Sequence, residues 1–496
     1  MSMFQAIELG HRLDKKEYKK REERLKTGLL ELQRRLRKSN STLLVIVAGV
    51  EGSGKGKVVS QLNTWLDTRG ITTNAYWDES DEERERPHMW RFWRDMPARG
   101  STGIMFGSWY TKPIVEMAFG RSRAVEFEQQ MMDINELERV LSEDGVIILK
   151  LWYHLSDQAQ DKLLQKEGEQ GLQSSPWLRE HAPLREEFAR VSEQAIRHTD
   201  QSYAPWHLIE AEDAYYRDIA TGEILLESLQ HRLDQEASWQ KHAQSDPFAQ
   251  GIDMPDANRS LLDLVDLEQS LDNATYKSEL ERLQAEASDL AWRARDEGIS
   301  AVCVFEGWDA GGKGGAIRRL TQAIDARLYQ VISVAAPSDE EKARHYLWRF
   351  WRQVPRNGRL TLYDRSWYGR VLVERVEGFA SHREWFRAYH EINAFEKQLT
   401  DANTVVLKFW LHISPQEQLR RFEEREKIAW KKHKITDEDW RNREKWDDYR
   451  LAVNEMVERT SSRAAPWVIV PANDKKFARI KVLSQFCQAL RKQLEK

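Results

Sequence analysis

The chain is poor in cysteine and has no long apolar run, and each shortage excludes a class of protein. Only Cys303 and Cys487 occur in 496 residues, too few for a disulfide framework or a cysteine zinc site. The longest apolar run, TLLVIVAGV from Thr42, is about half of what a membrane helix requires. The charged start, MSMFQAIELGHRLDKKEYKK, lacks the apolar centre of a signal peptide. We expect a cytoplasmic protein without membrane contact.

An excess of positive charge is also missing. Lysine and arginine number 76 against 80 aspartate and glutamate, which gives a formal net charge of −4. Proteins that bind nucleic acid through their overall charge are basic, so we expect no nucleic-acid partner. The length suffices for two or three domains with a substantial core.

The sequence contains one pattern that occurs twice. GVEGSGKGK begins at Gly49 and GWDAGGKGG at Gly307, a separation of 307 − 49 = 258 residues. The same spacing relates WRFWR at Trp90 and Trp348, and SWY at Ser108 and Ser366. A period this long indicates duplication of a whole domain rather than a solenoid repeat. We predict an N-terminal domain over 1–240 and a C-terminal domain over 256–496, joined by a polar stretch within 236–258.

Each copy alternates short apolar runs with segments of helical length. In the second copy the runs are AVCVFEG, QVISVAA, RLTLYDR, TVVLKFWLHIS and PWVIV. This alternation predicts an α/β fold in which helices flank a parallel sheet. Such sheets bind ligands at the carboxyl ends of their strands, which is where the distinctive residues lie.

The second copy carries a candidate phosphate loop, Gly307-x4-Gly312-Lys313, between a predicted strand and a helix. Its glycines let backbone N–H groups converge on phosphate oxygens, and Lys313 adds a positive charge. Gly314 follows the lysine where a serine or threonine usually helps to hold magnesium. A glycine-rich turn without a ligand is the alternative, although the motif occurs twice in matching context, which favours a tandem duplication of a P-loop kinase-like domain.

Two carboxylates are the candidate magnesium ligands. Asp364 ends the strand RLTLYD, where kinases of this type place a magnesium aspartate, and Asp309 lies four residues before Lys313. Two carboxylates suit a hard cation that keeps several waters. Asp364 could instead cap the following helix, but that would leave Arg365 unexplained.

The segments WDAGGKGG, LWRFWRQVPRNG and YDRSWYGRVLVERVEG together resemble the polyphosphate kinase 2 family, and the duplication resembles its two-domain class, the polyphosphate:AMP phosphotransferases. The resemblance implies Mg²⁺-dependent transfer of the terminal phosphoryl group of inorganic polyphosphate to AMP, which yields ADP, in an enzyme that is a homo-oligomer. It places Asp309 and Lys313 in the phosphate loop, Asp364 at the metal and Arg365 on phosphates.

A helical lid is predicted over 414–462. Ser414-Pro-Gln-Glu417 has the form of a capping box with proline at the first helical position, and a basic loop and a second helix follow. Its many cations suit a long polyanion, and a closing lid would exclude water. We assign phosphate contacts to Arg421, Arg425 and Lys432, although an ordinary solvated helix face could also carry this charge.

Arg370, which follows the strand of Asp364, is assigned to a phosphate as well. Glu374 belongs either to the nucleotide site or to a structural ion pair, because its counterpart Glu116 is present in the first copy.

The first copy lacks most of these groups. Glu51 replaces Asp309, and Phe106 and Gly107 stand at the positions of Asp364 and Arg365. Arg421 and Arg425 correspond to Leu163 and Glu167. We therefore expect a structural or regulatory first copy and a catalytic second copy.

Two other functions fit the same residues. An ATP-dependent nucleotide kinase would share the loop and the metal site. A scaffold that binds polyphosphate without turnover would explain the degenerate first copy. DNA binding by the lid is disfavoured, because Glu423, Glu424 and Glu426 interrupt its positive charge.

Overall fold

A computed structural model describes residues 2–169, 184–242, 260–427 and 437–496. The chain divides into two compact units. The first unit comprises Met1–Glu79, Arg91–Asp246 and Asp339–His345; the second comprises Ser80–Trp90, Pro247–Ser338 and Tyr346–Lys496. Most of the predicted boundary stretch, and Lys432 of the predicted lid, lie outside the described residues.

The second unit contains a five-stranded sheet, and the predicted strands are confirmed. The strands are β6 (Ser300–Gly307), β7 (Tyr329–Ser333), β8 (Leu360–Asp364), β9 (Thr404–His412) and β10 (Trp467–Pro471). They are parallel and run in the order β10-β9-β6-β8-β7. The strands β6 and β9 are buried along most of their lengths, as a sheet covered on both faces requires.

The first unit repeats this topology. Its strands are β1 (Thr42–Gly49), β2 (Ile71–Ala75), β3 (Thr102–Phe106), β4 (Val146–His154) and β5 (Trp206–Glu210). They are also parallel, in the order β2-β3-β1-β4-β5. Counted from the start of each unit, the two orders are the same, which confirms the predicted tandem α/β duplication.

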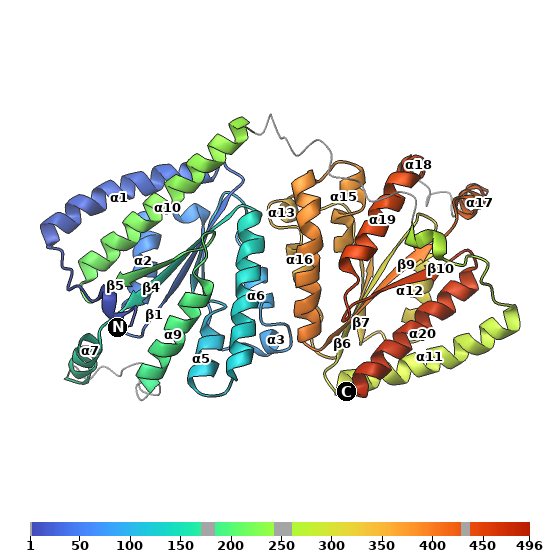
Figure 1. Cartoon of the computed structure of the whole chain (residues 1–496), viewed down its shortest axis with the longest axis horizontal. Helices are drawn as coiled ribbons and strands as arrows, with labels where there is room; N and C mark the ends of the chain where they lie inside the picture. The colour runs from blue at the N-terminus through green and yellow to red at the C-terminus, as the bar shows by residue number, and fades with distance from the viewer. Residues whose placement is uncertain (1, 170–183, 243–259, 428–436) are drawn as a thin grey trace. The chain divides into compact units, whose positions relative to one another are not determined.

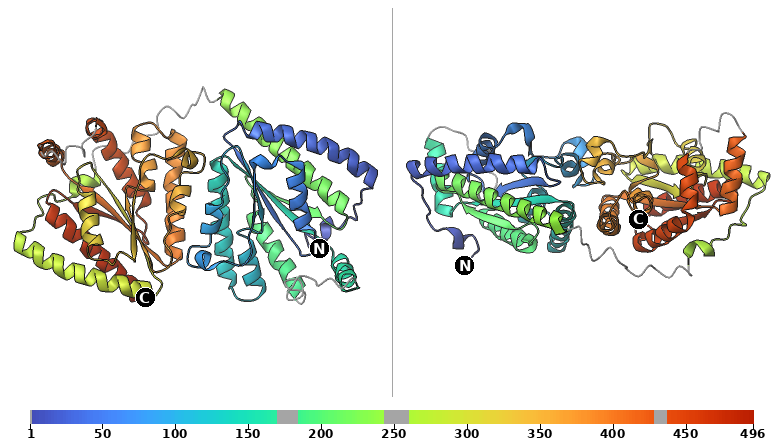
Figure 2. Two further views of the ribbon diagram at one scale, coloured as in Figure 1. Left: turned by 180° about the vertical axis from the view of Figure 1, so that it is seen from behind. Right: turned by 90° about the horizontal axis from the view of Figure 1, so that it is seen from above.

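Helices cover both faces of each sheet (Figure 1). In the second unit, α11 (Asn273–Asp296), α12 (Lys313–Thr321) and α20 (Lys475–Leu494) pack together on one face. The other face carries α15 (Val373–Val376), α16 (His382–Asp401) and α19 (Trp446–Thr460). The layers of each unit can also be followed from behind and from above (Figure 2).

The corresponding layers of the first unit are α1 (Lys15–Leu36), α2 (Lys55–Trp65) and α10 (Ala214–His242), and α5 (Thr111–Ala118), α6 (Ala124–Glu143) and α9 (Arg185–Thr199). The remaining helices are η1 (Gln5–Ile7), η2 (Thr68–Gly70), α3 (Asp81–Arg84), α4 (Trp90–Arg94), α7 (Asp157–Glu169), η6 (Leu261–Leu264), α13 (Asp339–Lys342), α14 (Trp348–Trp351), η7 (Trp367–Arg370), α17 (Pro415–Glu426) and α18 (Asp437–Glu444). None of the helices in the described part of the chain is both long and apolar enough to cross a membrane.

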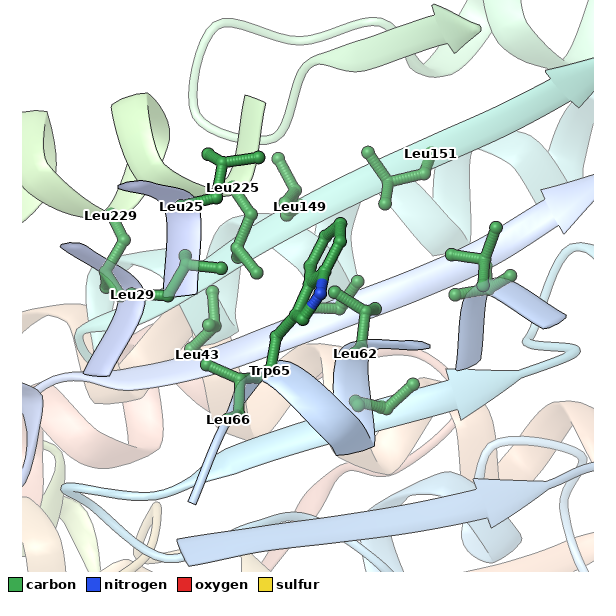
Figure 3. Close-up of a cluster of buried hydrophobic side chains, with 14 of the residues drawn as sticks. Leu25, Leu29, Leu43, Leu62, Trp65, Leu66, Leu149, Leu151, Leu225 and Leu229 are labelled. Atoms are coloured by element: carbon green, nitrogen blue, oxygen red, sulfur yellow. The ribbon is translucent and has the colours of Figure 1, made fainter. Parts of the chain in front are cut away.

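The core of the first unit forms where amphipathic helices meet the sheet. Trp65 at the end of α2 is 1% exposed. It lies among leucines from α1, β4 and α10, including Leu25, Leu149 and Leu225 (Figure 3). Leucines recur along α1 at helical spacing, which places them on the buried face.

A buried ion pair occurs in both units with the same geometry. Lys408 Nζ lies 2.7 Å from Glu396 Oε2, and Lys150 Nζ lies 2.7 Å from Glu138 Oε2. In each unit the glutamate also accepts a hydrogen bond from a tyrosine hydroxyl. Because the set is complete in both copies, it belongs to the domain scaffold and not to a site present in one copy. The aromatic residues of the two WRFWR segments are likewise buried.

The predicted lid differs from expectation in one respect. A single helix was expected after the basic loop, but Lys445 has φ −95° and ψ +26° and separates α18 from α19. Lys445 pairs with Glu377 at 3.0 Å, and the next residue, Trp446, stacks on Trp308. These two contacts hold the bend.

Candidate active site

The phosphate loop lies where strand β6 gives way to helix α12. Gly312 has φ +108° and caps α12, so the helix presents unpaired backbone N–H groups toward the loop. Gly307 has φ +147°, and a Cβ on it would lie 2.6 Å from the carbonyl oxygen of Leu411. Gly314 lies in the first turn of α12 with open space around it. The predicted strand–loop–helix arrangement is therefore present.

Sheet register brings a second segment to the same edge. Phe305 of β6 is paired with Asp364 of β8, so the loop after β6 and the segment after β8 leave from neighbouring carboxyl ends. The chain order of the strands reverses at this point, which is where open α/β sheets bind ligands.

The two loop lysines differ in their partners. Lys313 Nζ donates to the carbonyl oxygens of Gly307 at 2.6 Å and Trp308 at 3.3 Å, and it forms no ion pair with any described residue. Lys55 Nζ makes the equivalent hydrogen bond, to the carbonyl oxygen of Gly49 at 2.7 Å, but it also lies 2.8 Å from Glu51 Oε1. The first loop therefore neutralises its own lysine, whereas the second leaves the charge of Lys313 for a ligand.

Asp309 is held from three sides. Its Oδ1 accepts a hydrogen bond from Arg365 Nη2 at 3.3 Å, and its Oδ2 accepts one from Asn442 Nδ2 at 2.9 Å. Its backbone oxygen accepts from Gln418 Nε2 at 3.1 Å. The sequence predicted the two charged residues but missed Asn442, because one asparagine in a polar helix carries no recognisable pattern.

Arg365 and Ala310 occupy backbone conformations that favour glycine. Their φ angles are +64° and +60°, and their counterparts in the first copy are Gly107 and Gly52, both at φ +81°. A non-glycine residue in this region costs roughly 1–2 kcal/mol. The N–H of Arg365 donates to the carbonyl oxygen of Phe305 at 3.1 Å, which helps to hold the strained backbone. The second copy thus tolerates strain in order to present an arginine here.

Glu306 is a buried carboxyl beneath the loop that was not predicted from the sequence. It is 5% exposed, and its Oε1 accepts a hydrogen bond from Ser366 Oγ at 2.8 Å. Burial raises its pKa, while the nearby charges of Lys313 and Arg365 act in the opposite direction. Its counterpart in the first copy is Ala48. Comparison of the two loops could have found it, since it is another charged group that only the second copy has.

Arg421 lies beneath the loop. It is 2% exposed, and its guanidinium donates to the carbonyl oxygens of Ala310 at 2.8 Å, Ala472 at 2.6 Å and Asn473 at 2.9 Å. In the first unit an arginine from a different helix supports the loop, because Arg217 of α10 donates to the carbonyl oxygen of Ser53 at 3.3 Å. These contacts support the loop, and the phosphate contact assigned to Arg421 stays a prediction.

The other predicted phosphate ligands lie around this edge. Arg425 is half-buried on α17. Arg370 pairs with Glu374 at 3.1 Å and lies over the ring of Tyr346 at 4.6 Å, so the ion pair considered for Glu374 is present. Ser414 caps α17, with its Oγ accepting from the N–H of Glu417 at 3.1 Å. The reciprocal half of the predicted capping box is not formed, because the N–H of Ser414 donates to Asn473 Oδ1 at 3.0 Å.

The residues fit a magnesium ion that keeps most of its water. Within the described ranges, no group of three or more His, Cys, Asp or Glu side chains is placed to hold a metal. Asp364 is half-buried at the strand end, and among those same residues its carboxylate has no hydrogen-bond or ion-pair partner. A hard cation that binds one or two carboxylates and substrate phosphates needs no fuller cage.

Known proteins match this chain over nearly its whole length. The model of the family "Polyphosphate kinase 2 (PPK2)" matches residues 12–237 and again 270–496. The polyphosphate:AMP phosphotransferase of Pseudomonas aeruginosa is 44% identical over 492 residues, 98% of each chain. The protein of the same name from Acinetobacter johnsonii is 37% identical over 497 residues, 96% of each chain.

A solved structure agrees with these matches. A crystal structure from Pseudomonas aeruginosa that carries the name polyphosphate kinase 2 superposes with a TM-score of 0.88 at 42% identity, over 99% of each chain. With two copies of the family domain and full-length relatives, this chain belongs to the polyphosphate kinase 2 family.

Proposed function

We propose that this protein transfers the terminal phosphoryl group of inorganic polyphosphate to AMP, which forms ADP, and that the second copy is the catalyst. The observation that carries the proposal is the set of Lys313, Asp364 and Arg365 at one sheet edge, in which the lysine has no carboxylate partner and the arginine is held in a strained conformation. The names of the full-length relatives supply the donor and the acceptor.

The chemistry requires little covalent participation by the protein. The AMP phosphate is already a nucleophile at neutral pH, so the residues have to orient it and offset charge on the transferring group. Lys313 and Arg365 provide that positive charge. Asp309, fixed by Arg365 and Asn442, orients the acceptor phosphate or the metal.

Asp309 and Asp364 would hold Mg²⁺ together with phosphate oxygens and water. A bound ion would offset negative charge on the phosphates. Arg370, Arg425 and Lys432 are assigned to the polyphosphate chain, whose repeated negative charge matches several cations along the lid. Arg421, whose guanidinium donates to the loop carbonyl of Ala310, is assigned to the phosphates bound at that loop.

The first copy lacks the means for this chemistry. Lys55 is neutralised by Glu51, and Phe106 and Gly107 stand where the second copy has its aspartate and arginine. We assign the first copy a structural or regulatory role.

The test is ADP formation from AMP, Mg²⁺ and long-chain polyphosphate, with the wild type beside Asp364→Asn. Asp296→Asn, at an exposed aspartate on α11, is the matched control. We expect turnover in the wild type and control and its loss in Asp364→Asn. Equal activity in all three would contradict the second-copy assignment. Transfer with ATP but not with polyphosphate would replace the donor, and polyphosphate binding without any product would favour a scaffold.

A further inference from the structure

We propose that Asn442 is a positioning residue for Asp309, and that docking of helices α18 and α19 on the phosphate loop delivers it. The inference rests on the proposed function, since it concerns how the carboxylate of that site acquires its orientation.

The hydrogen bonds around Asn442 fix the direction of its amide. Its Nδ2 donates to Asp309 Oδ2 at 2.9 Å, and its Oδ1 accepts from the hydroxyl of Tyr449 at 3.3 Å. A tyrosine hydroxyl that donates to one end of the amide leaves the other end to donate to the carboxylate. With Arg365 on the opposite oxygen, both ends of the carboxylate are held.

Stacking holds the same helices on the loop. Trp446, the first residue of α19, lies with its ring centroid 3.6 Å from that of Trp308 at an interplanar angle of 9°. Trp308 directly precedes Asp309, and its Nε1 donates to Nδ1 of His412 at 3.0 Å. The loop tryptophan is therefore fixed on one side by β9 and on the other by α19.

A third contact links these helices to α17. Arg443, next to Asn442, donates to the carbonyl oxygen of Pro415 at 2.8 Å and to Gln418 Oε1 at 3.0 Å. Gln418 in turn donates to the backbone oxygen of Asp309. The loop, α17 and α18 thus form one connected network around a single aspartate.

The choice of an amide suits a carboxylate that must stay charged. Ionised aspartate offers about four acceptor positions, and Arg365 and Asn442 use two of them. The remaining positions are free for an ion or for the water around it. Arg365 forms an ion pair with Asp309, whereas the neutral amide of Asn442 orients the same carboxylate without offsetting its charge. In the first copy Glu51 is paired with Lys55, and Val50 stands where the second copy has Trp308.

The experiment measures kcat and KM for AMP and polyphosphate in the wild type, Asn442→Ala, Asn442→Gln, Trp446→Ala and the double variant Asn442→Ala/Trp446→Ala. Asn393→Ala, at an asparagine on α16 that bonds only the backbone of Arg459 among the described residues, is the matched control. Melting temperature and the circular-dichroism couplet expected of the stacked Trp308–Trp446 pair report folding and docking independently of turnover.

We expect Asn442→Ala to lower kcat about 10–100-fold, as loss of an orienting partner does, while both KM values change less than about twofold. Its couplet and melting temperature should match the wild type. Asn442→Gln, which keeps the donor, should recover part of the loss. If Trp446 acts through Asn442, the double variant should be no slower than the slower single variant.

Three results would overturn the proposal. The first is a wild-type kcat in Asn442→Ala. The second is a missing couplet and a lowered melting temperature in that variant. The third is a double variant in which the kcat losses of the two single variants add. A wild type that makes no ADP from polyphosphate would instead reject the proposed function, so the two failures are distinguishable.

Discussion

Replacement of Arg365 by the residue of the first copy should separate catalysis from stability. Arg365→Gly removes the strain of a non-glycine residue at φ +64°, roughly 1 kcal/mol after allowance for the greater freedom of glycine in the unfolded chain. It also removes the ion pair with Asp309, in which the arginine side chain is 43% exposed. A pair this exposed stabilises by about 0.5 kcal/mol. The gain exceeds the loss by about 0.5 kcal/mol, so the free energy of unfolding should rise by about 0.5 kcal/mol.

Turnover should respond in the opposite way. Loss of a group that offsets charge in the transition state costs about 10²–10³ in rate. The assay is ADP formation from AMP and polyphosphate, combined with calorimetry of the same preparations. A gain of about 0.5 kcal/mol would raise the melting temperature by about 1–2 °C in a unit of this size.

Two companion variants separate the effect of the lost charge from the effect of the relieved backbone strain. Arg365→Ala loses the same charge but keeps the strain, so it should be as inactive as Arg365→Gly and less stable by about 1 kcal/mol. Ala310→Gly relieves strain at φ +60° without loss of charge, and it should be more stable and remain active. An Arg365→Gly protein that is less stable than Arg365→Ala, or that keeps more than about a tenth of wild-type turnover, would refute the argument.

Three further predictions follow from the two copies and from buried groups. Lys313→Ala should lower ADP formation about 10²–10³-fold, whereas Lys55→Ala, assayed in parallel, should leave it unchanged; a loss in Lys55→Ala would assign activity to the first loop. Burial lowers the pKa of His412 to about 4, so its contribution to stability is complete above about pH 6.5 and is lost as pH falls toward 4; His412→Gln should flatten the melting temperature over that window, and an unchanged slope would contradict a buried neutral histidine. Burial raises the pKa of Cys487 to about 11, so we expect slow alkylation of the native protein at neutral pH; rapid labelling measured by mass spectrometry would contradict it.

The fold could be predicted from sequence because two periodic signals agreed in both copies. Apolar runs such as AVCVFEG became strands, and their alternation with helical segments fixed the parallel sheet. The loop and the end of β8 met because parallel strands carry their carboxyl ends to one edge. Asp309 and Arg365 could be placed near each other by that rule alone, and the structure joins them at 3.3 Å.

The remaining site residues depend on tertiary contacts that the local sequence does not encode. Arg421 and Arg425 share a helical spacing, yet Arg421 turns beneath the loop and Arg425 stays half-buried. Periodicity identifies a common face but not what that face meets. Asn442 becomes significant only because a bend at Lys445 brings Trp446 onto the loop. The bend follows from contacts with residues far away in sequence, so the local sequence around Lys445 does not predict it.

The positions of the two arginines that support the loops determine which helix of each copy can accept substitutions during divergence. In the first unit the support comes from Arg217 on α10, a helix packed on β4 and β5. Changes in α7 therefore leave the loop's anchor intact, which is consistent with Leu163 at the position of Arg421. In the second unit the anchor sits on α17 itself, so substitutions that alter its packing also disturb the loop. Random mutagenesis should find α7 permissive and α17 restrictive, although the two helices occupy matching places in the repeat.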